Sequence, residues 1–181
     1  MPAKTYLVLA AVLLAAVACG NTSSTSGSAA PSTTTAAAAA STPPVLTPTL
    51  AALPNGYNPR RDAKADIAAA LAKSKADKRP VLLDFGANWC PDCVALEHTF
   101  GTDTVRPVIN GFHVVAVDVG RFDRHLDLAT KYHLDLRTSG IPAFVVLSGT
   151  GKVRTTTNDG SFANARTMTP DKVAAFLKRW Q

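Results

Sequence analysis

No charged residue lies between Lys4 and Arg60 in this chain of 181 residues. The other charged side chains follow Arg60, together with the periodic apolar patterns that a folded core requires. The low charged fraction of 18% is therefore a property of the first third and not of the part that folds. We predict three regions, which are residues 1–18, residues 19–56 and a folded domain over residues 57–181.

Residues 6–18 form an apolar run of thirteen positions that begins shortly after Lys4 and ends immediately before Cys19. A helix that crosses a bilayer needs about 20 residues, whereas the hydrophobic region of a signal peptide has this shorter length. The end of the run resembles a bacterial lipobox, which implies cleavage before Cys19 and diacylation of its thiol. Ordinary secretory cleavage after Ala18 is the alternative. Either route predicts a domain on the extracytoplasmic side, held at the membrane if Cys19 is lipidated.

Residues 21–54 consist almost entirely of Ser, Thr, Ala, Gly and Pro, with no charge and no aromatic side chain. Such a segment buries too little apolar surface to offset the loss of chain entropy. We therefore predict that residues 19–56 form a disordered tether behind the lipidated Cys19.

Apolar runs alternating with helical patterns predict the elements of the folded domain. We expect helices over residues 63–76, 91–99, 105–110, 123–133 and 170–180, and strands over residues 81–85, 112–119, 143–147 and 152–157. The first two strands are joined by helices, which favours parallel pairing, and the last two form an antiparallel hairpin. The predicted fold class is α/β, a three-layer α/β/α sandwich with a central mixed sheet.

The motif Cys90-Pro91-Asp92-Cys93 begins where the first strand passes into a helix. Free backbone N–H groups and the helix dipole at such a junction stabilise a thiolate at Cys90. Cys93 lies one helical turn later, so its sulfur can close a disulfide with Cys90. We predict that Cys90 attacks a disulfide and that Cys93 resolves the mixed disulfide.

Two further features accompany the cysteine motif. Asp84 lies among apolar residues of the first strand, where burial raises the pKa of a carboxyl and suits it to accept the Cys93 proton. A solvated acid at a strand edge is the alternative. The segment Gly140-Ile141-Pro142 precedes the third strand, and a Pro there suggests a cis peptide bond, with an ordinary trans bond as the alternative.

Residues 64–181 resemble the thioredoxin family through Leu83-Asp84-Phe85, Trp89 to Cys93 and Gly140-Ile141-Pro142, in this order. The resemblance is closest to the exported thiol-reductase branch, such as the C-terminal domain of DsbD. It implies the thioredoxin fold and a redox-active Cys90–Cys93 disulfide. It also implies substrate contacts at Trp89, Pro91, Ile141 and Pro142, with Pro142 cis and facing the disulfide, Ile141 pairing through its backbone with the substrate, and Trp89 packing over the sulfurs.

Three positions depart from the family pattern. Ala116 stands where thioredoxin has a buried Lys near the acid, and residues 121–137 are longer than the thioredoxin segment. Pro91-Asp92 replaces Gly-Pro. A negative charge at Asp92 disfavours the neighbouring thiolate, which predicts a reducing pair on the scale from about −270 mV for thioredoxin to about −120 mV for DsbA.

Other functions are less compatible with the sequence. The net charge of +6 is not concentrated in a basic stripe, which disfavours nucleic-acid binding. Zinc needs two ligands besides Cys90 and Cys93, and no His pair has a matching spacing, so we predict no metal. A purely structural Cys90–Cys93 disulfide is also disfavoured, because a bridge that closes so short a loop removes little entropy from the unfolded chain.

We therefore expect a membrane-tethered thiol–disulfide oxidoreductase that acts on exported protein disulfides or dithiols. It would act as a monomer, with no cofactor besides its cysteine pair, and a separate electron donor would reduce it again. The alternative is a binding lipoprotein of the same fold that holds a partner or a metal without catalysis.

Overall fold

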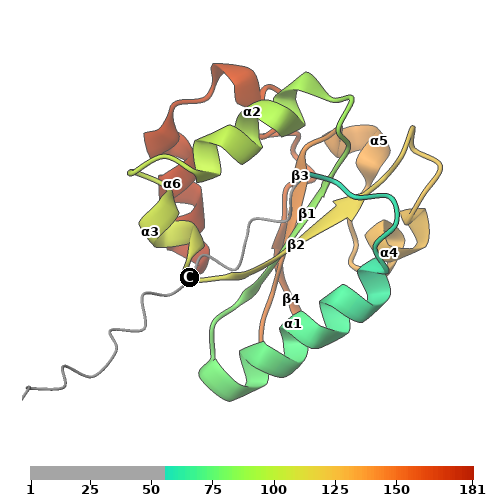
Figure 1. Ribbon diagram of the computed structural model, residues 1–181, viewed down its shortest axis with the longest axis vertical. Coiled ribbons are helices and arrows are strands. Elements are labelled where there is room, and N and C mark those ends of the chain that lie inside the picture. The colour runs from blue at the N-terminus through green and yellow to red at the C-terminus, as the bar shows by residue number, and fades with distance from the viewer. Residues whose placement is uncertain (1–55) are drawn as a thin grey trace, which may run out of the picture. The chain divides into compact units, whose positions relative to one another are not determined.

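The buried apolar runs form a four-stranded sheet in the order β2-β1-β3-β4 (Figure 1). Its strands are β1 (Val81–Gly86), β2 (His113–Asp118), β3 (Ala143–Leu147) and β4 (Val153–Thr156). β1 pairs with β2 in parallel, and the β1–β3 and β3–β4 pairs are antiparallel. The predicted mixed sheet is thus confirmed.

This computed structural model describes residues 56–181. The predicted signal peptide, Cys19 and the predicted tether up to residue 55 lie outside the described residues. Among residues 56–181, no helix combines the length and the apolar character that a membrane crossing requires.

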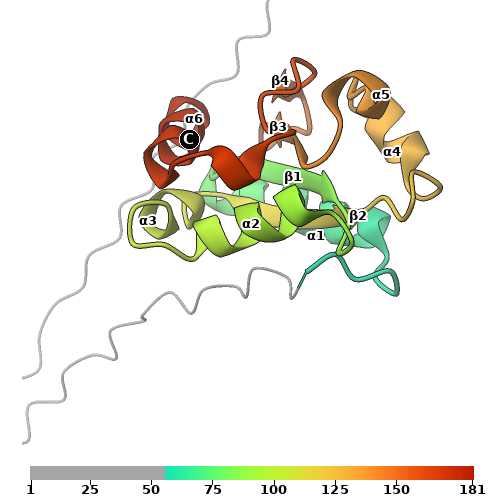
Figure 2. The ribbon, with the colours of Figure 1, turned by 90° about the horizontal axis from the view of Figure 1, so that it is seen from above.

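Helices cover both faces of the sheet and make the predicted three layers (Figure 1). One face carries α1 (Ala63–Asp77), α4 (Leu126–Lys131) and α5 (Leu136–Ser139). The other carries α2 (Pro91–Phe100), α3 (Arg106–Ile109), the 3₁₀ turn η1 (Ala165–Thr167) and α6 (Pro170–Trp180). Seen from above, α4 and α5 lie at the opposite end of the domain from α3 and α6 (Figure 2).

The pleat of β1 divides its side chains between the two faces. Leu83 and Phe85 pack into the core beneath α1, whereas Leu82 packs into the core beneath α2 and α6. Asp84 alternates with Leu83 and Phe85, so its carboxyl lies on the α2 side, where it lines a hollow with Glu97. The strand that forms the centre of the sheet thus places an acid beneath the helix that bears both cysteines.

Two predicted helices match their patterns closely. Asp62 caps α1, and its side chain accepts hydrogen bonds from the backbone N–H groups of Lys64 and Ala65. Helix α6 begins at Pro170, whose missing N–H costs nothing in a first turn.

The predicted helix over residues 123–133 is too long, because α4 spans only Leu126–Lys131. Phe122 and His125 adopt left-handed backbone angles, with φ of 63° and 52°, which a helix cannot contain. Residues 120–125 therefore form a loop at the end of β2. The short helix α5 and the turn η1 were absent from the predicted order, since neither is long enough to produce a periodic pattern.

Candidate active site

Cys90 is the N-cap of α2, as the position of Pro91 in the first helical turn predicts. Its backbone is extended, and its sulfur accepts a hydrogen bond from the N–H of Cys93 at 3.2 Å. Cys90 is 4% exposed and Cys93 is fully buried. Cys90 is thus the sulfur that an incoming disulfide can reach first.

The segment before β3 lies directly against this sulfur. Sγ of Cys90 donates to the carbonyl oxygen of Ile141 at 3.6 Å, and the Ile141–Pro142 peptide bond is cis, which confirms that prediction. Cys90 and Cys93 are free thiols here, so the structure shows the dithiol form and the predicted disulfide stays a prediction.

Asp84 is buried, with 5% of its surface exposed, so the alternative of a solvated strand-edge acid is wrong. Its pKa is raised from 3.8 to about 7, chiefly by burial, and the negative charge of Glu97 contributes in the same direction. A hydrogen bond from Tyr57 acts in the opposite direction. A carboxyl that titrates near neutral pH can both accept and release a proton under ordinary conditions.

Cys93 needs such an acceptor. Its burial raises the pKa of its thiol well above the usual range, and the hydrogen bond with Cys90 and the charge of Asp84 add to this effect. The pair is therefore asymmetric, because the buried thiol keeps its proton until a base removes it.

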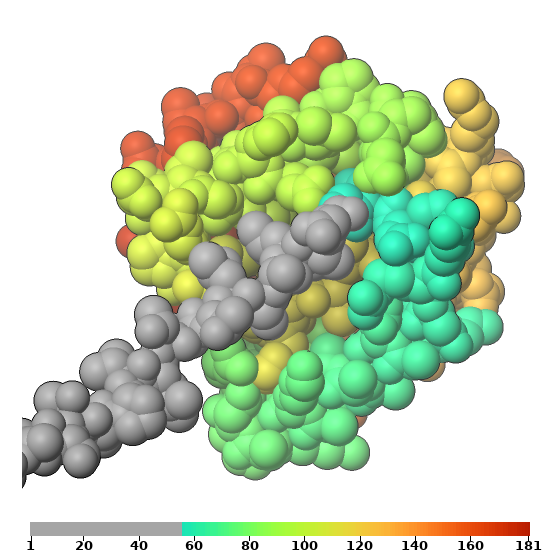
Figure 3. All heavy atoms as spheres, viewed as in Figure 1, coloured from blue at the N-terminus to red at the C-terminus, as the bar shows by residue number. Residues whose placement is uncertain are grey.

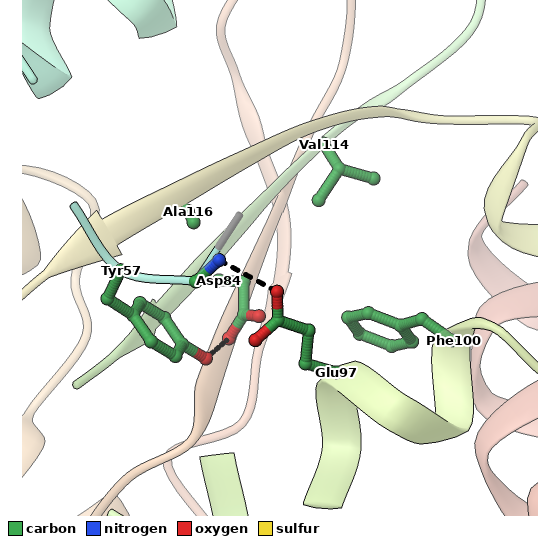
Figure 4. A pocket seen from close by; sticks show the side chains of 7 residues that line it. Tyr57, Asp84, Glu97, Phe100, Val114 and Ala116 are labelled. Atoms are coloured by element: carbon green, nitrogen blue, oxygen red, sulfur yellow. Dashed lines mark hydrogen bonds between the residues drawn. The ribbon is translucent and has the colours of Figure 1, made fainter. Parts of the chain in front are cut away.

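The sequence analysis did not assign two residues that lie near Asp84, Tyr57 and Glu97. The Tyr57 hydroxyl donates to Oδ1 of Asp84 at 3.0 Å, and Oε1 of Glu97 accepts the N–H of Gly56 at 2.8 Å (Figure 4). No periodic pattern marks Tyr57. Glu97 could have been recognised as a neighbour of the cysteines, because it follows Cys93 by one helical turn.

Ala116 is the register partner of Asp84 on β2, and it lines the same hollow. Its methyl group offers no charge to the carboxyl, as expected from its departure from thioredoxin.

The side chain of Asp92 lies away from solvent and is bound by η1. Its Oδ1 accepts from the backbone N–H of Arg166 at 2.9 Å and from Nε of Arg166 at 3.2 Å. The sequence analysis treated the negative charge of Asp92 as uncompensated. In the structure, Nε of the Arg166 guanidinium lies 3.2 Å from Oδ1 of Asp92 and opposes that charge.

Trp89 is held by the loop that follows β2. Its Nε1 donates to the carbonyl oxygen of Gly120 at 2.6 Å, and the ring of Phe122 meets its edge at a centroid distance of 6.2 Å. Arg121 lies over its face at 5.8 Å. Trp89 and Phe122 are 47% and 41% exposed, so the lengthened segment adds an aromatic surface next to the cysteine motif.

The described residues contain no cluster of three or more His, Cys, Asp or Glu side chains arranged to hold a metal ion.

Known proteins are similar to this chain in sequence and fold. A family model described as thioredoxin-like matches residues 62–149. The structure of a disulphide isomerase from Xylella fastidiosa Temecula1 is 43% identical, with a TM-score of 0.65. That match covers 68% of this chain and 94% of the isomerase chain.

The thiol:disulfide interchange protein DsbD of Klebsiella pneumoniae subsp. pneumoniae is 29% identical over 118 residues. The match covers 65% of this chain but only 18% of the length of that protein. The oxidised C-terminal domain of DsbD from Neisseria meningitidis is 24% identical, with a TM-score of 0.51. The match covers 66% of this chain and 97% of that domain, and at this identity it shows a similar fold and no more. The chain belongs to the thioredoxin-like family of thiol–disulfide oxidoreductases.

Proposed function

We propose that this domain reduces or isomerises disulfide bonds of exported proteins through Cys90 and Cys93, as a monomer tethered to the membrane by a lipid on Cys19. The observation that carries the proposal is the position of the Cys90 sulfur. It caps α2, lies against the Ile141 carbonyl next to the cis Pro142, and is the more accessible sulfur of the pair.

The first step is attack on a substrate disulfide. The Cys90 thiolate forms a bond with one substrate sulfur, the substrate S–S bond breaks, and the other sulfur leaves with the electron pair. The backbone of Ile141 and the exposed ring of Trp89 would hold the substrate segment beside Cys90.

The second step resolves the mixed disulfide. Asp84 takes the proton of Cys93, whose sulfur then attacks Cys90 and expels the second substrate sulfur as a thiolate. The substrate gains two electrons, and Cys90 and Cys93 end as a disulfide. A separate dithiol donor would return the pair to the form seen here, with no other cofactor.

Export and tethering are supported by the sequence before the domain. Residues 6–18 have the length of a signal-peptide core, and Cys19 follows a lipobox-like end. The similar proteins from Xylella and Klebsiella are named for disulfide isomerisation and thiol:disulfide interchange. Mass spectrometry of the mature chain tests this part, since a diacylglyceryl group on Cys19 should be absent in Cys19→Ala.

The activity is tested by insulin-disulfide reduction with the full chain. We expect Cys90→Ser to abolish it and Cys93→Ser to trap a mixed disulfide with the physiological partner, detectable by mass. Cys19→Ser is the matched control, because it removes a cysteine outside the pair. Equal activity in Cys90→Ser and the unaltered chain would reject catalysis and favour a binding protein of the same fold.

A further inference from the structure

The carboxyl of Asp84 has one side-chain hydrogen-bond donor among residues 56–181, the phenol of Tyr57. The two side chains are 5% and 2% exposed, so water contributes little to either. The phenol reaches Asp84 from the segment before α1, whereas Asp84 projects from the middle of β1 (Figure 4). The contact therefore ties the first described residues of the chain to the acid beneath the cysteines.

The other groups that face Asp84 do not favour its charge. Helix α2 presents the carboxyl of Glu97 together with Cys93, and strand β2 presents Val114 and Ala116. No cation lines the hollow within the described residues. Against burial and a second acid, the phenol is the group that favours a carboxylate at Asp84.

The phenol stays a donor throughout the working pH range. Burial raises the pKa of Tyr57 well above its usual value, and the charge of Asp84 raises it further. Tyr57 therefore remains a protonated hydrogen-bond donor to Asp84. It supplies a fixed dipole directed at the oxygen where negative charge resides.

The surrounding chain fixes the ring in place. The amide of Asn88 bonds the Tyr57 backbone in both directions, accepting its N–H at 2.8 Å and donating to its carbonyl oxygen at 2.9 Å. Glu97 on α2 accepts the preceding N–H of Gly56. The first described residues accordingly lie against α2 on the molecular surface (Figure 3).

Strand β1 leaves space for the phenol. A Cβ at Gly86 would lie 2.7 Å from Cε1 of Tyr57 and would overlap Cζ and the hydroxyl. The ring thus occupies space that any larger residue at Gly86 would fill.

From this geometry we infer that Tyr57 is a positioning residue for the resolving step, which holds Asp84 as the carboxylate that removes the Cys93 proton. The inference rests on the proposed function, in which Asp84 is that base. The proton passes from the Cys93 sulfur to Asp84, a bond forms between the two cysteine sulfurs, and the substrate sulfur leaves with the electron pair. Tyr57 gains and loses no atom, and its hydroxyl only stabilises the charge of Asp84 before the transfer.

The direct test is the titration of Asp84, followed by the carboxyl ¹³C resonance in the reduced full chain. Tyr57→Phe removes only the hydroxyl and should move the midpoint upward by about one pH unit, because hydrogen bonds to charged acceptors are the stronger ones. Tyr132→Phe is the matched control, since Tyr132 is a buried Tyr at the end of α4, and it should leave the midpoint unchanged. An unmoved midpoint in Tyr57→Phe would overturn the inference.

The second test measures resolution itself. A mixed disulfide of Cys90 with thionitrobenzoate is prepared, and the release of the coloured thiol by Cys93 is followed from pH 5 to about pH 9. Tyr57→Phe should slow release about fivefold at pH 7 and recover at higher pH, as a one-unit rise in the Asp84 midpoint requires. In an Asp84→Asn background, Tyr57→Phe should leave the rate of release unchanged. An equal slowing in that background would show that Tyr57 does not act through Asp84.

Failure of this inference and failure of the proposed function give different results. If Cys90→Ser abolishes insulin reduction but Tyr57→Phe leaves the Asp84 midpoint unmoved, only the role of Tyr57 is rejected. If insulin reduction persists in Cys90→Ser, the proposed function is rejected, and with it the role of Tyr57 in catalysis, whatever the titration shows.

Discussion

Asp92 and Arg166 are joined by two hydrogen bonds although 74 positions separate them in the chain. The Asp92 side chain is 12% exposed and the Arg166 side chain 60%. A buried acid between two cysteines thus has its countercharge on the turn before α6. The charge that Asp92 brings to the active site consequently depends on a residue from the far end of the domain.

Substitution of Arg166 and substitution of Asp92 should therefore shift the redox potential of the cysteine pair in opposite directions. Arg166→Ala removes the positive charge and leaves Asp92 to disfavour the Cys90 thiolate, so the pair should become more reducing, by on the order of 10 mV given solvent screening of Arg166. Asp92→Asn should make it less reducing by on the order of 10–30 mV. Equilibration with a glutathione buffer measures both values.

Lys64→Ala is a control for this experiment, because Lys64 pairs with Asp127 on the opposite face of the sheet. Its potential should equal that of the unaltered domain. Shifts of the same sign in Arg166→Ala and Asp92→Asn would contradict the electrostatic explanation.

The buried carboxyl of Asp84 predicts an unusual pH dependence of stability. Its pKa rises from 3.8 in the unfolded chain to about 7 in the folded one, so the folded state holds the proton more tightly. The resulting stabilisation is complete below pH 3.8 and is lost as the pH rises to about 7. The change is at most about 4 kcal/mol, since one pKa unit corresponds to about 1.4 kcal/mol.

Asp84→Asn should remove this dependence. The stability difference between the variant and the unaltered reduced protein should shift in favour of the variant by up to about 4 kcal/mol as the pH rises from 4 to 8. Urea unfolding at the two pH values measures the difference. Asp103→Asn, which changes an almost fully exposed side chain, should show no such gain, and parallel pH profiles for the unaltered chain and Asp84→Asn would argue against a raised pKa.

Features that depend on neighbours in sequence were predictable. Apolar residues on both sides of Asp84 indicated its burial and hence its raised pKa. The helix over residues 63–76 was expected, and the helical crossover between the first two strands indicated their parallel pairing. In each case the physical cause acts over a few residues or follows from chain connectivity.

Features that depend on tertiary contacts could not be predicted from the sequence. Tyr57 contacts Asp84 across 27 positions, and only the folded chain shows that Asn88 bonds its backbone and that Gly86 leaves space for its ring. The pairing of Asp92 with Arg166 has the same origin, and the sequence alone did not indicate this countercharge. The helix over residues 123–133 was overextended because apolar spacing does not reveal left-handed backbone angles at His125 and His133.

Glu97 should raise the pH at which Asp84 becomes a base. Its charge raises the pKa of Asp84, so Glu97→Gln should lower the midpoint of the resolution profile by less than about one pH unit. The amide oxygen can still accept the Gly56 N–H, which separates the loss of charge from the loss of the contact. Thionitrobenzoate release measures the midpoint, with Asp103→Asn as the control, and a midpoint that rises would be inconsistent with repulsion between the acids.

Gly86→Ala should expel the Tyr57 ring from the space beside β1. Its Cβ would overlap the phenol, so we expect a loss of about 1–3 kcal/mol in the free energy of unfolding. With Tyr57→Ala already present, the same change should cost close to zero, because the obstructed ring is gone. Urea unfolding of the four proteins in this cycle measures the coupling, and Gly101→Ala, where a Cβ would lie 3.3 Å from the nearest carbonyl oxygen, serves as a control with little expected coupling. Equal costs of Gly86→Ala in both backgrounds would mean that the glycine serves the strand itself and not the tyrosine that reaches Asp84.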